Sequence, residues 1–172
     1  LEKTASTFFW MEEGVDDGAI LSQKWIDIAP HDTSSVLYQK IMDVAVNQIY
    51  CLVLAMRSGR VNSIPQDPEK ATYWRKRTRA DGIIHWSMSA DTIYNLVRAL
   101  APPYPCAEFR FRHDYVAVLR CEKMPEKYPL DIEPGKVLWK ESESLVVKCA
   151  GPDAVKLWVR NNVTLPQLGE YL

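Results

Sequence analysis

Apolar and polar positions alternate in two stretches near the start of the chain. Residues 4–10 are rich in Thr and aromatic side chains, and residues 19–28 are apolar and end in an alternating Trp-Ile-Asp-Ile run. A period of two is typical of β-strands. We therefore predict two strands, joined by a glycine-containing turn over residues 11–18.

A helical period follows these strands. Apolar residues between about residues 33 and 58 recur at steps of three and four, which predicts one long helix with an apolar face. The polar residues 32–34 can cap its start, and Gly59 can end it. A second helix is predicted from its cap Ser89 to Leu100, before two consecutive prolines. The face of the long helix consists of Val36, Leu37, Ile41, Val44, Ala45, Ile49, Leu52 and Val53.

Short β-like runs fill the C-terminal part of the chain, separated by polar turns. They predict a small β-barrel-like domain. The fold class that we expect is α/β, with a domain over residues 1–103 that holds the long helix and a small β domain over residues 104–172. The predicted strands of the second domain are about 107–112, 115–121, 136–140, 144–149 and 154–159.

Composition and charge exclude some classes of protein. The formal net charge is −1, so no overall field attracts nucleic acid or an anionic membrane. No apolar run approaches the roughly 18 residues of a membrane span, so we expect no membrane partner. The irregular spacing of the cysteines favours a reducing compartment, and we expect a cytoplasmic location. Residues 107–172 carry mixed charges without an evident aromatic–basic stripe, which argues against a β barrel that binds nucleic acid.

The cysteines give no sign of a metal site. The four are irregularly spaced without a C-x-x-C pair, so we predict neither a metal nor a disulfide. Cys51 lies in the apolar helical run and is predicted to be part of the core.

Two segments carry candidate chemistry. Asp16 lies in the turn between the predicted strands, where a rigid scaffold can expose a carboxylate and partial burial can tune its pKa, as a general base requires. The alternative is a solvated hairpin turn. The stretch of residues 73–77 combines aromatic and basic side chains and can bind phosphate and stack on a base; the alternative is a charged loop that Trp74 anchors to the core.

Four segments occur in the order of motifs known from one family. Together they resemble the folate-dependent formyltransferases, which include methionyl-tRNA formyltransferase and the sugar N-formyltransferases. The segments are residues 4–23, which are close to G-V-T-x-H-x-M-x-x-G-L-D-x-G-x-I-x-x-Q; 73–86, close to Y-x-x-R-x-P-E-D-G-x-I-D-W; 93–107, close to I-x-x-L-I-R-A-x-x-P-x-P-G-A-F; and 134–137, close to P-G-x-V.

The resemblance implies roles for the turn. Asp16 matches the catalytic Asp, and the donor would be 10-formyltetrahydrofolate. The cofactor-binding residues would be Met11, Glu12, Glu13, Gly14 and Val15, whose backbone would lie along the pterin.

The chain departs from the family pattern in several places. His85, Cys106 and Arg79 stand where Asp, Gly and Pro are usual, and the family's Asn-x-His-Pro-Ser motif has no counterpart among these residues. The chain therefore resembles the C-terminal portion of a formyltransferase, and whether it is active alone stays open.

The resemblance leaves the acceptor amine open. Tyr73, Trp74, Arg75 and Arg77 are the predicted substrate-binding residues, and the small β domain favours a nucleotide-linked amino sugar as acceptor over a transfer RNA. A methionyl-tRNA formyltransferase is the alternative within the family. In another class, the chain would be a non-catalytic interaction module or part of a homodimer, in which association covers an exposed apolar face.

Overall fold

The computed structural model describes residues 1–160 and 164–172. The chain forms two compact units, one of Leu1–Asp32 with Val36–Lys76 and one of Thr33–Ser35 with Arg77–Leu172. The predicted division into residues 1–103 and 104–172 concerns the family's domains rather than these units, and it stays a prediction.

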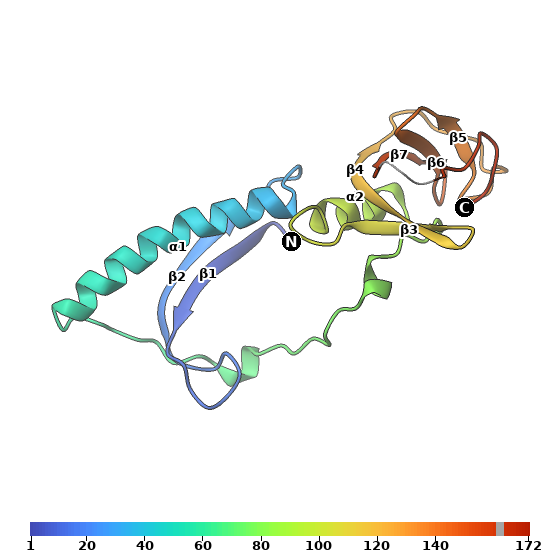
Figure 1. The fold of residues 1–172 in the computed structure, drawn as a ribbon. Helices are drawn as coiled ribbons and strands as arrows, with labels where there is room; N and C mark the ends of the chain where they lie inside the picture. Colours follow the sequence, from blue (N-terminus) through green and yellow to red (C-terminus); the bar gives the residue numbers. More distant parts are fainter. Residues whose placement is uncertain (161–163) are drawn as a thin grey trace. The chain divides into compact units, whose positions relative to one another are not determined.

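The first unit consists of a β-hairpin and a long helix. Strands β1 (Lys3–Phe9) and β2 (Ile20–Asp27) pair antiparallel, with a bulge between Phe8 and Phe9. Helix α1 (Ser34–Arg57), most of which belongs to this unit, lies along the hairpin (Figure 1). A short 3₁₀ turn, η1 (Pro68–Lys70), follows. Both predicted strands and the helix are confirmed.

The hairpin covers only a narrow stripe of α1. Gln48 is the one fully buried side chain of the helix and donates from Nε2 to the backbone oxygen of Ser6 at 3.2 Å and to the Ser22 hydroxyl at 2.8 Å. Cys51, predicted to be core, is instead exposed. The physical reason is that two strands are too few to cover a helix that is apolar on several sides. The apolar α1 residues that are more than two-fifths exposed are Val36, Tyr38, Met42, Val46, Ile49, Tyr50, Val53, Leu54 and Met56.

The second unit is one antiparallel sheet with a helix on it. Its strands have the order β3-β4-β7-β6-β5, and α2 (Ala90–Ala99) packs on β4 and β7. The sheet is open from β3 to β5 in the described residues, so the barrel-like form is not confirmed. A 3₁₀ turn, η2 (Arg79–Gly82), precedes α2. The strands are β3 (Ala107–Phe111), β4 (Asp114–Lys123), β5 (Val137–Lys140), β6 (Ser144–Lys148) and β7 (Ala154–Val159).

The core of this unit lies between α2 and the inner face of the sheet. Ile93 and Val97 of α2 are buried, as their four-residue spacing predicts, and the Ser89 hydroxyl caps the helix by accepting from the N–H of Thr92 at 3.2 Å. The Trp86 ring is buried, with its centroid 5.7 Å from that of Phe109.

The outer face of the sheet carries an aromatic–basic ladder that the sequence analysis missed. The Arg120 guanidinium lies 4.6 Å from the centroid of the Trp158 ring, and the Lys156 ammonium lies 5.1 Å from Trp158 and 4.8 Å from Trp139. The prediction that residues 107–172 lack such a stripe is therefore wrong. The four residues come from three strands, β4, β5 and β7, so only the sheet brings them together.

Carboxylates neutralise this ladder. Glu122 pairs with Arg120, and an Oε2 of Glu141 lies 3.5 Å from the Lys156 ammonium. Val146 of β6 lies opposite Lys156 of β7 and Trp139 of β5 in the sheet and is only 3% exposed. The ladder therefore shields β6 from water and adds little net charge.

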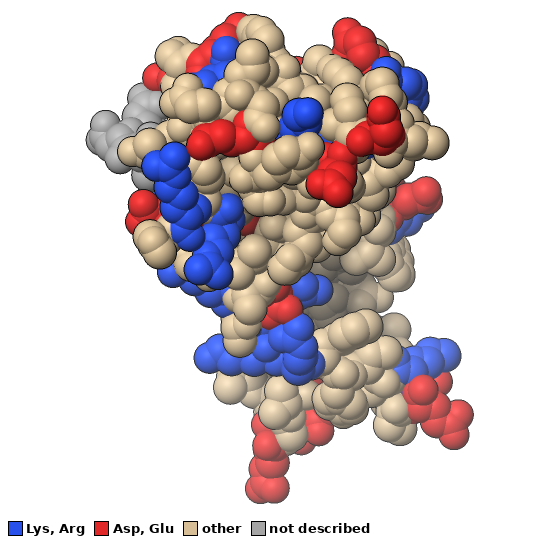
Figure 2. Space-filling view, turned by 90° about the vertical axis from the view of Figure 1, so that its right-hand side faces the viewer, with Lys and Arg blue, Asp and Glu red and all other residues tan. Residues whose placement is uncertain are grey.

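Charges of both signs are mixed on the surface. Figure 2 shows acidic and basic side chains interspersed on the visible face. Neither helix in the described part of the chain has the length and apolar composition needed to cross a membrane.

Candidate active-site loop

The segment between β1 and β2 is an ordered loop with Asp16 near its end. The Trp10 N–H donates to the Ala19 oxygen at 3.0 Å and closes the loop at its base. Asp16 has a φ of 57°, in the left-handed region. Asp and Asn adopt this region more readily than most residues, which favours an Asp or Asn at this position.

Two glycines allow the chain to fold tightly here. A Cβ at Gly18 would collide with the backbone oxygen of Trp10, and a Cβ at Gly14 would collide with the carboxylate of Asp17. The Asp17 side chain is thus folded back over Gly14. This placement distinguishes Asp17 from the adjacent Asp16.

Gln66 fixes the backbone around Asp16. Its Nε2 donates to the backbone oxygens of Asp16 and Gly18 at 2.8 and 2.7 Å. Two hydrogen bonds between Ile20 and Ile64, of 2.7 and 2.9 Å, bring this segment to the loop. The sequence analysis did not identify Gln66, because a single Gln in a proline-containing loop forms no pattern.

The loop is open to solvent. Residues 11–17 are all exposed, with Met11 at 94% and Val15 at 82%. Asp16 is therefore exposed rather than partly buried in this chain. The predicted cofactor-binding residues Met11, Glu12, Glu13, Gly14 and Val15 lie with Asp16 on this one loop, and their peptide groups are accessible.

The predicted substrate-binding segment is an extended, exposed stretch. Tyr73 and Trp74 are 86% and 88% exposed, so Trp74 does not anchor the segment to the core. The Arg75 guanidinium donates to the backbone oxygen of Lys76 at 3.3 Å. Tyr73, Trp74 and Arg75 belong to the first unit and Arg77 to the second.

No metal site is evident in the part of the chain that the structure describes. Among residues 1–160 and 164–172, no three His, Cys, Asp or Glu side chains are grouped so that they could hold a metal ion. All four cysteines are free thiols.

Family models match both parts of the chain. The model described as "Formyl transferase" matches residues 2–54, and the model described as "Formyl transferase, C-terminal domain" matches residues 76–161. The chain belongs to the formyl transferase family, as its motifs predict.

A curated relative agrees with this family. The chain is 31% identical over 147 residues to a methionyl-tRNA formyltransferase of Leptospira interrogans, a match that covers 86% of this chain and 46% of the relative. The chain thus spans less than half the length of this relative.

Solved structures share the fold. One is an N-formyltransferase from Helicobacter canadensis in complex with folinic acid and dTDP-3-aminofucose. It matches with a TM-score of 0.70 at 13% identity, and the match covers 92% of this chain and 56% of that protein's chain. Another is HypX from Aquifex aeolicus in complex with tetrahydrofolic acid, with a TM-score of 0.72 at 17% identity. This match covers 91% of this chain and 27% of the HypX chain. The α/β fold class is confirmed by these likenesses.

Proposed function

We propose that this chain is part of an enzyme that transfers a formyl group from 10-formyltetrahydrofolate to an amine. The observation that carries the proposal is the loop around Asp16, in a chain of the formyl transferase family. Gln66 and two glycines hold its backbone, Asp16 is exposed, and the Asp17 carboxylate lies over Gly14.

The chemistry requires a positioned carboxylate. The amine nitrogen attacks the formyl carbon, the bond from that carbon to N10 of the folate breaks, the amine loses a proton and N10 gains one. In the family a His takes part in this proton transfer, and the Asp orients it and raises its basicity. Asp16 would have this role, which is a form of general acid–base catalysis.

The peptide groups of residues 11–15 suit a pterin. A flat heterocycle with an amide edge is recognised by backbone donors and acceptors, so the identity of these side chains has little influence on binding. The folate-type ligands of the N-formyltransferase and of HypX support this assignment.

The acceptor that we propose is a nucleotide-linked amino sugar. Residues 77–172 contain thirteen Lys and Arg and twelve Asp and Glu. This near balance provides no strong positive potential to attract the phosphates of an RNA backbone. The exposed rings and guanidinium groups of residues 73–77 can stack on a base and bind a diphosphate. The name of the Leptospira interrogans relative favours the alternative acceptor, methionyl-tRNA.

Calorimetry with a non-hydrolysable analogue of 10-formyltetrahydrofolate tests the folate site. We expect the parent chain to bind it and Asp16→Asn to bind it at least about tenfold more weakly, because a carboxylate beside the ligand is lost. Asp17→Asn is the matched control and is expected to bind like the parent. Absence of binding by the parent chain would contradict the assignment of the folate site to this loop.

The exposed face of α1 favours a second candidate function, self-association. Val46 and Tyr50, four residues apart, are 61% and 67% exposed, and such patches mark interaction sites. This function predicts a dimer in sedimentation equilibrium that Val46→Lys with Tyr50→Lys converts to a monomer. Leu130→Lys, at a residue that is 77% exposed in the second unit, is the control. A parent chain that stays monomeric at all concentrations would exclude it.

A further inference from the structure

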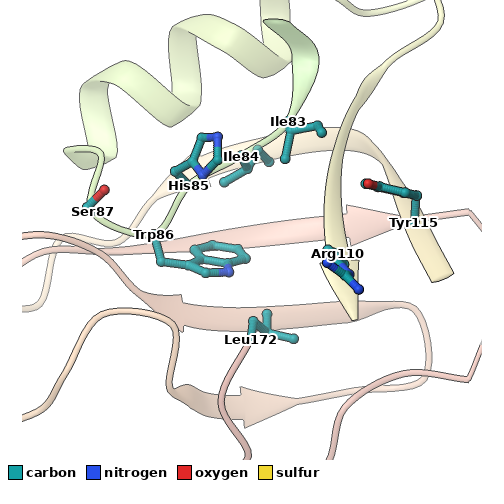
Figure 3. Close-up of a pocket in the computed structure, with 8 residues that line it drawn as sticks. All are labelled: Ile83, Ile84, His85, Trp86, Ser87, Arg110, Tyr115 and Leu172. Atoms are coloured by element: carbon teal, nitrogen blue, oxygen red, sulfur yellow. The ribbon is translucent and has the colours of Figure 1, made fainter. Parts of the chain in front are cut away.

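The second unit contains a pocket that the proposed function does not use. It has a volume of about 480 Å³ and lies between the segment that precedes α2 and the strands β3 and β4 (Figure 3). A volume of this size is typical of small-molecule sites. The lining residues that matter here are Ile83, His85, Trp86, Ser87, Arg110 and Tyr115.

The polar lining of the pocket is one of donors. Arg110 and Tyr115 are directly opposite each other on β3 and β4, and Figure 3 shows both on the same side of the pocket, across from His85 and Trp86. The Ser87 hydroxyl and the His85 ring add further polar groups, no Asp or Glu side chain lines the pocket, and the lining is completed by Ile84 and Leu172. This composition favours an anionic ligand.

The charges around β3 leave one guanidinium without a carboxylate partner. Arg79 forms a two-point ion pair with Glu108, at 2.7 and 3.1 Å, which raises the pKa of Arg79. Arg112 pairs with Glu170 at 3.3 Å. Arg110, between them on the same face, pairs with no carboxylate among the described residues; its Nε donates to the backbone oxygen of Arg112 at 3.3 Å. Its terminal nitrogens can therefore form the bidentate contact that phosphate favours.

The rest of the lining is apolar and aromatic. The Trp86 ring is held in the core against Phe109, and the Tyr115 ring is held by the Arg79 guanidinium, 4.5 Å from its centroid. Ile83 completes an apolar wall beside these rings. Fixed rings of this kind favour a flat heterocycle at little cost in conformational entropy.

We propose that this pocket binds a nucleoside diphosphate, with the phosphates on Arg110 and the base against the aromatic wall. The site is distinct from the loop around Asp16 and from residues 73–77. The proposal does not rest on the proposed function, because the pocket residues all belong to the second unit and the loop around Asp16 belongs to the first.

Titration calorimetry of the full chain with thymidine diphosphate tests the proposal. We expect Arg110→Met to raise the Kd at least about tenfold and Arg110→Lys to raise it less, since Lys keeps the charge and loses the fork. Arg112→Met, which removes a guanidinium of the same face outside the pocket, is the matched control and is expected to change the Kd less than about threefold. Inorganic pyrophosphate should bind more weakly than thymidine diphosphate, because it leaves the aromatic wall empty.

Other results would overturn the proposal. One is an equal loss of affinity for thymidine diphosphate in Arg110→Met and Arg112→Met. Another is a parent chain that binds a short single-stranded RNA but does not bind thymidine diphosphate. Loss of binding in Arg75→Met with full binding in Arg110→Met would also overturn it, because the nucleotide would then lie on the exposed segment. Thermal unfolding of each variant checks the fold, and binding of thymidine diphosphate by Asp16→Asn at parental affinity separates this site from the folate site.

Discussion

Replacing Asp16 by Asn is expected to slow formyl transfer by about 10² to 10⁴-fold, which corresponds to roughly 3 to 5 kcal/mol of activation free energy. The reason is chemical: the amide has nearly the same shape as the carboxylate but cannot stabilise the positive charge that proton transfer creates on the partner His. Asn also tolerates the left-handed φ of 57° at this position, so the loop should keep its form. The rate is measured in a single turnover with 10-formyltetrahydrofolate and the amino-sugar nucleotide.

The neighbouring aspartate provides the control for this experiment. The Asp17 side chain is folded over Gly14, and Asp17→Asn should keep the parental rate to within a few-fold. If Asp16→Asn transferred the formyl group at more than a tenth of the parental rate, Asp16 would have no part in proton transfer. If both variants lost activity equally, the effect would come from the loop conformation rather than from the Asp16 charge.

The elements of this fold were predictable because each depends on a local pattern. Alternation identified β1 and β2, and the three- and four-residue steps identified α1, whose end at Gly59 fits the positive φ of 65° there. The departure at Cys106 also has a physical meaning. Its φ of 72° lies in the region that favours glycine, which is the residue that the family motif has at this point.

The features that could not be predicted depend on contacts between distant residues. Gln66 reaches the loop only because residue 64 pairs with residue 20 across the chain, and the ladder of Arg120, Trp158 and Lys156 exists only in the assembled sheet. The exposure of Cys51 was missed for a related reason. Helical periodicity shows that a face is apolar, but the number of strands available to cover it is a property of the tertiary fold.

High pH is expected to unfold the second unit through two buried thiols. Burial raises the pKa of Cys121 to about 12, with Cys149 as a further cause, and burial raises the pKa of Cys149 to about 12 against the opposing effect of Lys148. The unfolded chain ionises these thiols near pH 9, whereas the folded chain keeps them protonated up to about pH 12. Their contribution to the free energy of unfolding is therefore complete below pH 9 and is lost as the pH rises to 12. A shift of this size corresponds to about 4 kcal/mol for each thiol.

Cysteine variants isolate this effect from the titration of Tyr and Lys side chains in the same range. We expect Cys121→Ala and Cys149→Ala each to remove up to about 1.4 kcal/mol per pH unit from the decline in the free energy of unfolding above pH 9. Both variants start from a lower stability at pH 8, because each leaves a small cavity. Cys51→Ala changes an exposed thiol of the first unit, and its free energy of unfolding should decline with pH as that of the parent does. Urea unfolding at pH 8, 9.5 and 11 measures the decline, and equal slopes for the parent and the Cys121 and Cys149 variants would show that these thiols ionise as readily in the folded as in the unfolded chain.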